Sequence, residues 1–234
     1  MSSPLGFHAT APVSLPALKA FATEGIAVKL KVKDGDEEII VQMVKIDGMK
    51  GLSQVLLHSQ QFYSEVDTGQ FVVIENQYKL FWMTLTGTAL ACWDNLYNKI
   101  PVGDPLDFRV HIDQFIHSFC MPSSRAQQIS YVRLLKKSRS DDVAFFKIAQ
   151  ETLLAFATWM PGDEEIPNEA ECKRIFFDAM PFKWHENFTM AGNDAATKSF
   201  SEIEQYMHLQ ECYSISNHDG KLHSPKIKLQ QWQI

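Results

Sequence analysis

The stretch YKLFWMTLTGTALACWDNLYNKIPVGDPLDFRVHIDQFIHSFC, residues 78–120, decides the fold class of this chain. Its first half carries apolar residues at the i, i+3, i+4, i+7 spacing of an amphipathic helix: Tyr78, Phe81, Trp82, Leu85, Ala89, Cys92, Trp93 and Leu96. This spacing predicts one helix of about six turns, which ends at Pro101. The second half predicts another helix, with Asp104 as its N-cap and Pro105 at the first helical position. The apolar face of that helix is expected to contain Phe108, Ile112, Phe115, Ile116 and Phe119.

Both helices present a continuous apolar stripe, which is typical of packing surface, whereas the polar groups of catalytic centres usually converge from loops. We expect the following residues to form the core of an N-terminal helical lobe: Phe81, Trp82, Leu85, Ala89, Trp93, Phe108 and Phe115. Trp93 and Phe108 are expected to contribute most to holding that lobe together.

The length and the charge of the chain limit the classes of protein to which it can belong. The 234 residues predict one or two compact domains, and 28 acidic against 22 basic residues give a formal charge of −6. This mild acidity argues against broad nucleic-acid binding by the ordered part of the chain. No secretory-signal pattern opens the sequence, and no apolar run approaches the roughly 20 residues that span a bilayer. A soluble intracellular protein without a membrane partner is therefore predicted.

Cysteine spacing agrees with that interpretation. Cys92, Cys120, Cys172 and Cys212 are far apart and include no C-x-x-C pair. Three of them, all but Cys120, lie within helical patterns, which predicts buried thiols in a reducing compartment.

The periodicity changes along the chain and suggests its organisation. Residues 1–24, which contain three prolines, are expected to be a flexible leader with one helical turn at 15–21. Between 27 and 44, Val and Leu alternate with Lys and an Asp-Gly-Asp turn follows, which predicts a β-hairpin. From residue 48 onward the pattern is helical. The predicted fold is mainly α, with two helical lobes at 25–121 and 122–213 and a disordered tail at 214–234.

Capping signals mark several helix starts in the C-terminal half. Asn168 with Glu171 and Ser199 with Glu202 both have the spacing of a capping arrangement. Ser140 or Asp141 is expected to cap a long helix that ends near residue 159.

Two short motifs suggest chemistry, and in each case a structural interpretation is favoured. Asp67-Thr68-Gly69 matches the D-T-G of aspartic proteases, but no hydrophobic strand precedes it, so an ordinary turn between helices is predicted. His208 and Cys212 are spaced i, i+4 and could face one metal, yet structural zinc needs four ligands and no second pair is evident. We therefore predict no catalytic, metal-binding or cofactor-binding residues.

The densest basic cluster consists of Arg133, Lys136, Lys137 and Arg139. Such a cluster could contact RNA phosphates, and these residues are the weak candidates for RNA contact. More often a run of this kind is the solvated end of a helix at the start of a linker, and that interpretation is favoured here.

The order of these elements resembles the capsid region of Gag polyproteins from long-terminal-repeat retrotransposons, gypsy-like or copia-like, including domesticated Gag-derived capsids. An L-x-G-x-A run at 85–89 precedes Trp93, and a helix with spaced phenylalanines follows at 108–119. A long helix then begins near Asp142, and the run IFFDAMP at 175–181 is followed by an aromatic turn. The similarity covers about 75–213. Lys136-Lys137 and Asp142 depart from the usual residues of the family, and the chain contains no C-x2-C-x4-H-x4-C zinc knuckle.

The resemblance implies a retroviral-capsid-like fold and a structural function without an enzymatic activity or a cofactor. Copies of the chain would self-assemble through lobe-to-lobe contacts into a cytoplasmic, virus-like particle that packages retroelement RNA. RNA would be bound weakly, or through a region outside this chain. Because the aromatic content is high for two small lobes, exposed aromatic contacts between subunits are expected, and the candidates are Trp184, Phe188 and Phe182.

Two other functions remain open at this point. A Gag-derived cellular adaptor would share the fold and bind peptide ligands in a hydrophobic groove of one lobe. A helical enzyme with a site invisible in one sequence would show several titratable groups with perturbed pKa values in a pocket. Concentration-dependent particle formation separates the capsid from the adaptor, which would stay monomeric or dimeric.

Overall fold

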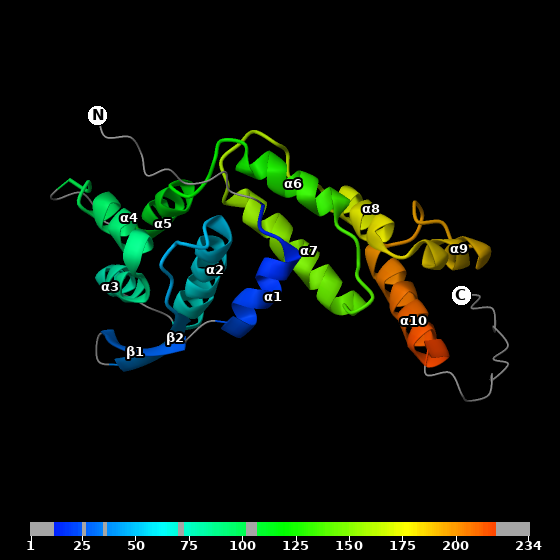
Figure 1. The fold of residues 1–234 in the computed structure, drawn as a ribbon, viewed down its shortest axis with the longest axis horizontal. Coiled ribbons are helices and arrows are strands. Elements are labelled where there is room, and N and C mark those ends of the chain that lie inside the picture. The colour runs from blue at the N-terminus through cyan, green and yellow to red at the C-terminus, as the bar shows by residue number, and fades with distance from the viewer. Residues whose placement is uncertain (1–11, 25–26, 35–36, 70–72, 102–106, 219–234) are drawn as a thin grey trace.

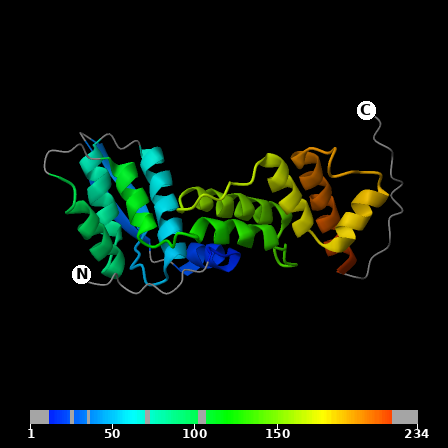
Figure 2. The same ribbon diagram turned by 90° about the horizontal axis from the view of Figure 1, so that it is seen from above.

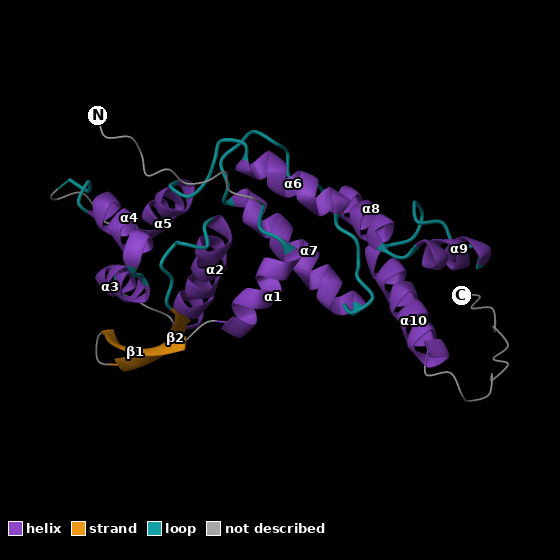
Figure 3. Ribbon diagram, in the orientation of Figure 1, coloured by secondary structure: helices purple, strands orange, loops and turns teal. Residues whose placement is uncertain are grey.

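The computed structural model describes residues 12–24, 27–34, 37–69, 73–101 and 107–218. Within these residues the chain is mainly α, as predicted, and Figure 3 shows the helices and the single pair of strands. The elements are α1 (Leu15–Glu24), β1 (Ala27–Asp34), β2 (Glu37–Val44), α2 (Leu52–Gly69), α3 (Ile74–Thr84), α4 (Gly87–Tyr97), α5 (Phe108–His117), α6 (Ser124–Leu134), α7 (Val143–Thr158), α8 (Glu169–Ala179), α9 (Phe182–Met190) and α10 (Phe200–His218).

The molecule is elongated. In Figures 1 and 2, α2 to α5 and the two strands lie at one end, α6 and α7 run through the middle, and α8 to α10 lie at the other end. Helix α1 lies beside α7 and also contacts α2, so the N-terminal segment reaches the middle of the molecule.

β1 and β2 occupy the segment for which the hairpin was predicted. They pair antiparallel in a register that runs from Ala27 opposite Val44 to Asp34 opposite Glu37. A lone two-stranded hairpin is only marginally stable in water. Helix α2 packs against β2 and α3 against β1, so the hairpin is supported by the helices at its end of the molecule.

The single long helix predicted over 78–96 is wrong, because the chain leaves the helix between α3 and α4. The Ile46 main chain crosses this point: its N–H donates to the Thr84 carbonyl at 3.0 Å, and its carbonyl accepts from the Thr86 N–H at 2.8 Å. Gly87 begins α4 with φ of +51°, a left-handed conformation that a side chain disfavours. A distant segment therefore supplies the hydrogen bonds that a continuous helix would have made along its own backbone.

The start of the next helix also differs from the prediction. Residues 102–106, which include the expected cap Asp104, lie outside the described residues. Asp107 is the N-cap of α5, and its carboxylate accepts from the N–H groups of Arg109 and Val110. Helix α7 is likewise capped one residue later than predicted, by Asp142, whose carboxylate accepts from the Phe145 N–H at 2.6 Å.

The two remaining capping predictions are confirmed. Asn168 accepts from the Glu171 N–H at 3.0 Å at the start of α8. Before α10, the Ser199 hydroxyl accepts from the Glu202 N–H, and the Glu202 carboxylate accepts from the Ser199 N–H at 2.8 Å.

Buried apolar side chains form two clusters. The first core includes residues of β2 and of α2 to α5, and it continues into α6 and α7 through Val132, Leu153, Phe156 and Met160. The second core joins the start of α7 to α8, α9 and α10, and it contains Val143, Phe146, Phe176, Ala179, Met180, Trp184, Phe188, Ile203 and Met207. The division between the cores therefore does not coincide with the lobe boundary predicted at 121–122.

Six of the seven predicted core residues are buried in the first core: Phe81, Leu85, Ala89, Trp93, Phe108 and Phe115. Trp82 is the exception, since it is 47% exposed and its indole N–H donates to Asp94 of α4 at 2.9 Å. Phe81 and Trp82 are consecutive in α3, so their side chains point about 100° apart, and the buried face of the helix contains Tyr78, Phe81 and Thr84.

The terminal predictions need correction as well. The flexible leader is wrong for residues 12–24, because Val13 is fully buried and α1 packs against the rest of the chain. The expected disordered tail from 214 is wrong for its first residues, because α10 continues to His218. Residues 1–11 and 219–234 lie outside the described part of the chain.

Candidate functional site

Trp184 and Phe188, which we predicted to be exposed contact residues, instead form the seam between α9 and α10. Trp184 is only 7% exposed, and its indole N–H donates to the Ser214 hydroxyl at 3.3 Å. The Phe188 ring packs edge-on against Tyr206 with centroids 4.9 Å apart. The prediction of exposure is therefore wrong for both residues, because α10 covers the face of α9 that carries them.

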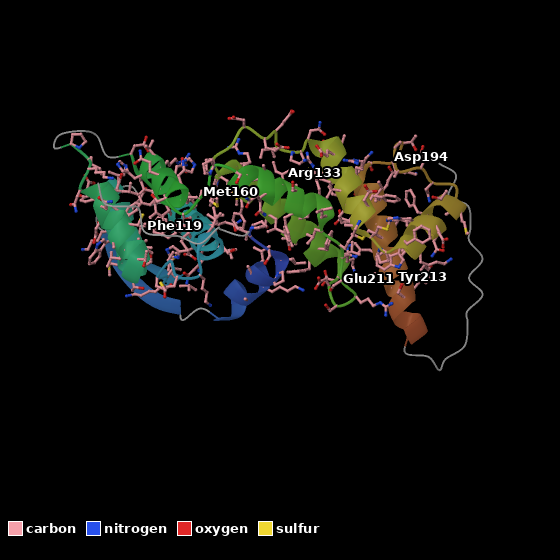
Figure 4. The ribbon with its side chains drawn as sticks, turned by 45° about the horizontal axis from the view of Figure 1, so that its top comes forward. Phe119, Arg133, Met160, Asp194, Glu211 and Tyr213 are labelled. Carbon is pink, nitrogen blue, oxygen red and sulfur yellow. The ribbon has the colours of Figure 1, made fainter. Side chains whose placement is uncertain are left out.

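Phe182, the third candidate, is exposed as predicted. It is 73% exposed, and Met190 at the other end of α9 is exposed to a similar extent. On α10, Leu209 and Tyr213 lie one turn apart and are each about half exposed, and Figure 4 labels Tyr213. We call these four residues the C-terminal apolar surface.

A second set of exposed apolar side chains lies at the opposite end of the molecule. Met49 before α2, Trp82 on α3, Tyr97 on α4 and Val110 on α5 are all exposed, and we call them the N-terminal apolar surface. The elements that carry them lie at the far end from α9 and α10 in both views (Figures 1 and 2). An elongated molecule with exposed apolar groups at both ends can contact more than one neighbour at once.

Two lysines, Lys137 of the connector before α7 and Lys147 of α7, bind α10, and each lies between a carboxylate and an aromatic ring. Lys137, with a side chain only 4% exposed, bonds Glu211 at 2.8 Å and lies 5.1 Å from the centroid of Trp184. Lys147 bonds Glu204 at 2.8 Å and lies 5.3 Å from the centroid of Phe200. The bond to Glu204 raises the pKa of Lys147. Both charges stabilise the arrangement of helices that carries the C-terminal apolar surface.

Lys19 of α1 makes a third bridge of the same kind. Its ammonium group bonds the Asp141 carboxylate and lies 5.2 Å from the centroid of Phe145. Burial alone would raise the pKa of Asp141, but the bonds from Lys19 and Ser138 outweigh burial and lower it. The start of α7 is thus bridged to α1 on one side and to α10 on the other.

The structure does not bring the four basic candidates together as an RNA-contact surface. Arg133 is paired with Glu164 and Glu171, and the Lys136 ammonium donates to the Asp178 carbonyl at 2.7 Å. The prediction of an exposed cationic group is wrong for Lys137, which is buried against Trp184 and Glu211. Arg139 is exposed on the connector before α7.

His58 is a buried titratable residue that sequence reasoning missed. The Thr84 hydroxyl donates to the Phe81 carbonyl at 2.6 Å, so its oxygen accepts from the His58 Nε2–H at 2.9 Å. This assigns the neutral Nε2–H tautomer to His58 and leaves its Nδ1 without a hydrogen-bond partner. Desolvation lowers the pKa of His58 to about 3, although the Val44 backbone partly opposes the shift. The sequence pattern of α2 gives no local indication that His58 is buried in a neutral form.

The two short motifs, His208 with Cys212 and residues 67–69, both lie within helices. His208 lies 3.8 Å from the Glu211 carboxylate, and no group of three or more His, Cys, Asp or Glu side chains that could hold a metal occurs among the described residues. Residues 67–69, the D-T-G run, form the last turn of α2 and not a turn between helices. Of the cysteines, Cys92, Cys120 and Cys172 are half-buried, whereas Cys212 is exposed, contrary to the prediction of a buried thiol.

No protein-family model, curated protein or solved structure that was compared with this chain matches it. In the described part of the chain, none of the helices combines the length and the apolar character that crossing a membrane requires.

Proposed function

We propose that this chain is a structural, Gag-like capsid subunit that self-assembles into a shell. The observation that carries the proposal is the exposure of apolar side chains at both ends of an elongated, two-core helical molecule, with Leu134 and Ile148 exposed in its middle as well. The order of sequence motifs, which resembles retrotransposon Gag capsids, supports the same conclusion.

Assembly would depend on many weak and identical contacts. Fully burying one Phe or Met side chain stabilises by about 2 kcal/mol, so a contact built on Phe182 and Met190 alone would be weak. A subunit that engages neighbours at both ends gains from multivalency, because each further contact in a closed lattice is effectively intramolecular. Weak single contacts are therefore sufficient for a stable shell.

The proposal includes the packaging of retroelement RNA, as the resemblance implies. Lys137 is excluded from this part of the proposal by its burial, and Arg133 is largely neutralised by its two glutamate partners. RNA contact would therefore involve Arg139 or residues outside the described part of the chain.

Electron microscopy of the purified protein at raised salt and concentration tests the proposal. We expect closed particles from the wild-type chain and a loss of at least ten-fold in particle yield for the double variant Phe182→Asp/Met190→Asp. The matched control is Ser130→Asp, which adds a negative charge at an exposed position of α6 in the middle of the molecule. A wild-type chain that stays monomeric or dimeric under all conditions would contradict the capsid function and favour the adaptor.

A further inference from the structure

The segment 12–24, which we call the strap, is held on α6 and α7 by a side chain that recognises its backbone. The Gln128 amide carbonyl accepts from the Val13 N–H at 2.8 Å, and the amide nitrogen donates to the Val13 carbonyl at 3.2 Å. Gln128 is 0% exposed, and its second amide hydrogen is directed to the Leu153 carbonyl of α7 at 3.3 Å. Both polar groups of Val13 are therefore bonded by one buried and oriented amide.

Further contacts extend this recognition along the strap. The Leu15 N–H donates to the Tyr131 hydroxyl at 2.9 Å, and Lys19, about one turn further along α1, bonds Asp141. Val13 and Leu15 are both buried. The site thus contacts the main chain of Val13 and Leu15, buries both of their side chains and pairs with one cation, Lys19.

These contacts are of a kind that any copy of the strap could make. The bonds to Gln128 and Tyr131 involve main-chain groups just before and at the start of α1, and side chains of the same residues are buried beside them, as in the recognition of peptides by backbone hydrogen bonds with pockets for side chains. Residues 12–24 form one contiguous segment before β1, and the contacts above join this segment to α6, α7 and the connector before α7. Exchange of an identical terminal element between copies keeps every bond and adds a link between subunits.

We infer that Gln128, Tyr131 and Asp141 form a docking site for the strap, filled within one copy by its own residues 12–19, and that in the assembly it is filled by the strap of a second copy. The exchange between copies depends on the proposed self-association. The docking site itself does not, and the two parts are tested separately.

Peptide binding tests the docking site. A labelled peptide of residues 10–20 is titrated into the full-length Val13→Asp variant, in which the buried charge weakens the resident strap, and fluorescence anisotropy is recorded. We expect binding at least ten-fold tighter than to the wild-type chain, because there the peptide competes with a tethered strap whose effective concentration is in the millimolar range. The matched control is Pro16→Asp, which adds the same charge at an exposed position of the strap. A folded Val13→Asp chain that fails to bind the peptide would overturn the docking site.

Complementation tests the exchange. The Val13→Asp variant has an intact docking site, but its own strap binds that site weakly. The Gln128→Leu variant has an intact strap, but its docking site binds a strap weakly. We expect sedimentation velocity of an equal mixture to show a two-chain complex at a concentration ten-fold below that at which either variant associates alone. A mixture that stays monomeric while the peptide binds would overturn exchange and leave the docking site in place.

A chain that keeps both Val13 and Gln128 provides a test that does not depend on the folding of these variants. An equal mixture of ¹⁴N and ¹⁵N chains carrying a photoreactive residue in place of Pro16 is cross-linked under assembly conditions. Mixed-isotope products between the strap and α6 support exchange, and products of one isotope only would overturn it. Absence of particles in the microscope together with peptide binding would contradict the capsid function but not the docking site.

Discussion

The two hydrophobic cores are held together by different means. In the first core, Phe81 contacts Trp93 with centroids 4.6 Å apart, Phe62 at 4.9 Å and Phe115 at 5.4 Å, the last two in nearly perpendicular arrangements. In the second core, aromatic contacts such as that of Phe188 with Tyr206 are supplemented by charged lysines that lie between rings and carboxylates beside α10. Aromatic packing is insensitive to salt, whereas ion pairs at the surface weaken as salt is added. The partly exposed Lys147–Glu204 bond is therefore the one of these contacts that added salt should weaken most.

The largest expected effect is in the first core. Phe81→Ala removes a fully buried ring that contacts several others, and we expect a loss of about 4 kcal/mol in the free energy of unfolding. The matched control is the neighbouring Trp82→Ala, expected to cost less than about 1 kcal/mol because that ring is largely exposed. Urea denaturation followed by circular dichroism measures both values. Equal losses would show that the aromatic cluster does not dominate this core.

The second core is tested by Lys137→Met. This change removes the lysine partner of the Glu211 carboxylate, which is itself mostly buried and keeps its bond from the Val143 N–H, so we expect a loss of about 3 kcal/mol. The double variant Lys137→Met/Glu211→Gln removes both charges and is expected to recover at least half of that loss. A double variant as unstable as the single one would mean that packing of the lysine stem, and not the buried charge, carries the effect.

Acid should destabilise the first core through His58. Its folded-state pKa of about 3 lies below the unfolded value of 6.5, so the unfolded chain binds more protons and stability is lost as the pH falls below 6.5. We expect a loss of about 2 kcal/mol between pH 7 and pH 5, at about 1.4 kcal/mol per pH unit. Denaturation midpoints at several pH values should show this slope, and His58→Gln should remove it. An unchanged slope in that variant would assign the acid sensitivity to other groups.

Features that depend on neighbouring residues could be predicted from the sequence, and features that depend on distant ones could not. The Ser199–Glu202 capping box and the buried face of α5 follow from residues three or four positions apart. The helix break before Gly87 requires Ile46, and the docking of the strap requires Gln128, more than a hundred residues from Val13. A prediction by periodicity extends a helix wherever its apolar spacing continues, so it misses such breaks.

The candidate site shows the same limit. An aromatic stripe on α9 predicts a face that is either buried in the core or exposed for contact with another subunit, but it does not distinguish the two. Trp184 is buried because α10 supplies Ser214 and Lys137 caps its ring, and Phe182 remains exposed because no element covers it among the described residues. The ion pairs at the start of α7 join residues from α1, the connector and α10, so no local pattern could reveal them.

The smallest expected effect concerns the partly exposed bridge between α7 and α10. Lys147→Met removes the bond to Glu204, and because this pair is partly shielded from solvent we expect a loss of about 1 kcal/mol at low salt. Lys183→Met is the matched control, since Lys183 pairs with Glu186 within one exposed helix face and should contribute less than about 0.5 kcal/mol. In 1 M sodium chloride the difference between the two variants should shrink, because screening weakens the Lys147–Glu204 attraction in the wild-type chain. A difference that persists at high salt would mean that Lys147 acts through its contact with the Phe200 ring, and the contrast between an aromatic first core and an ion-paired second core would then apply to Lys137 alone.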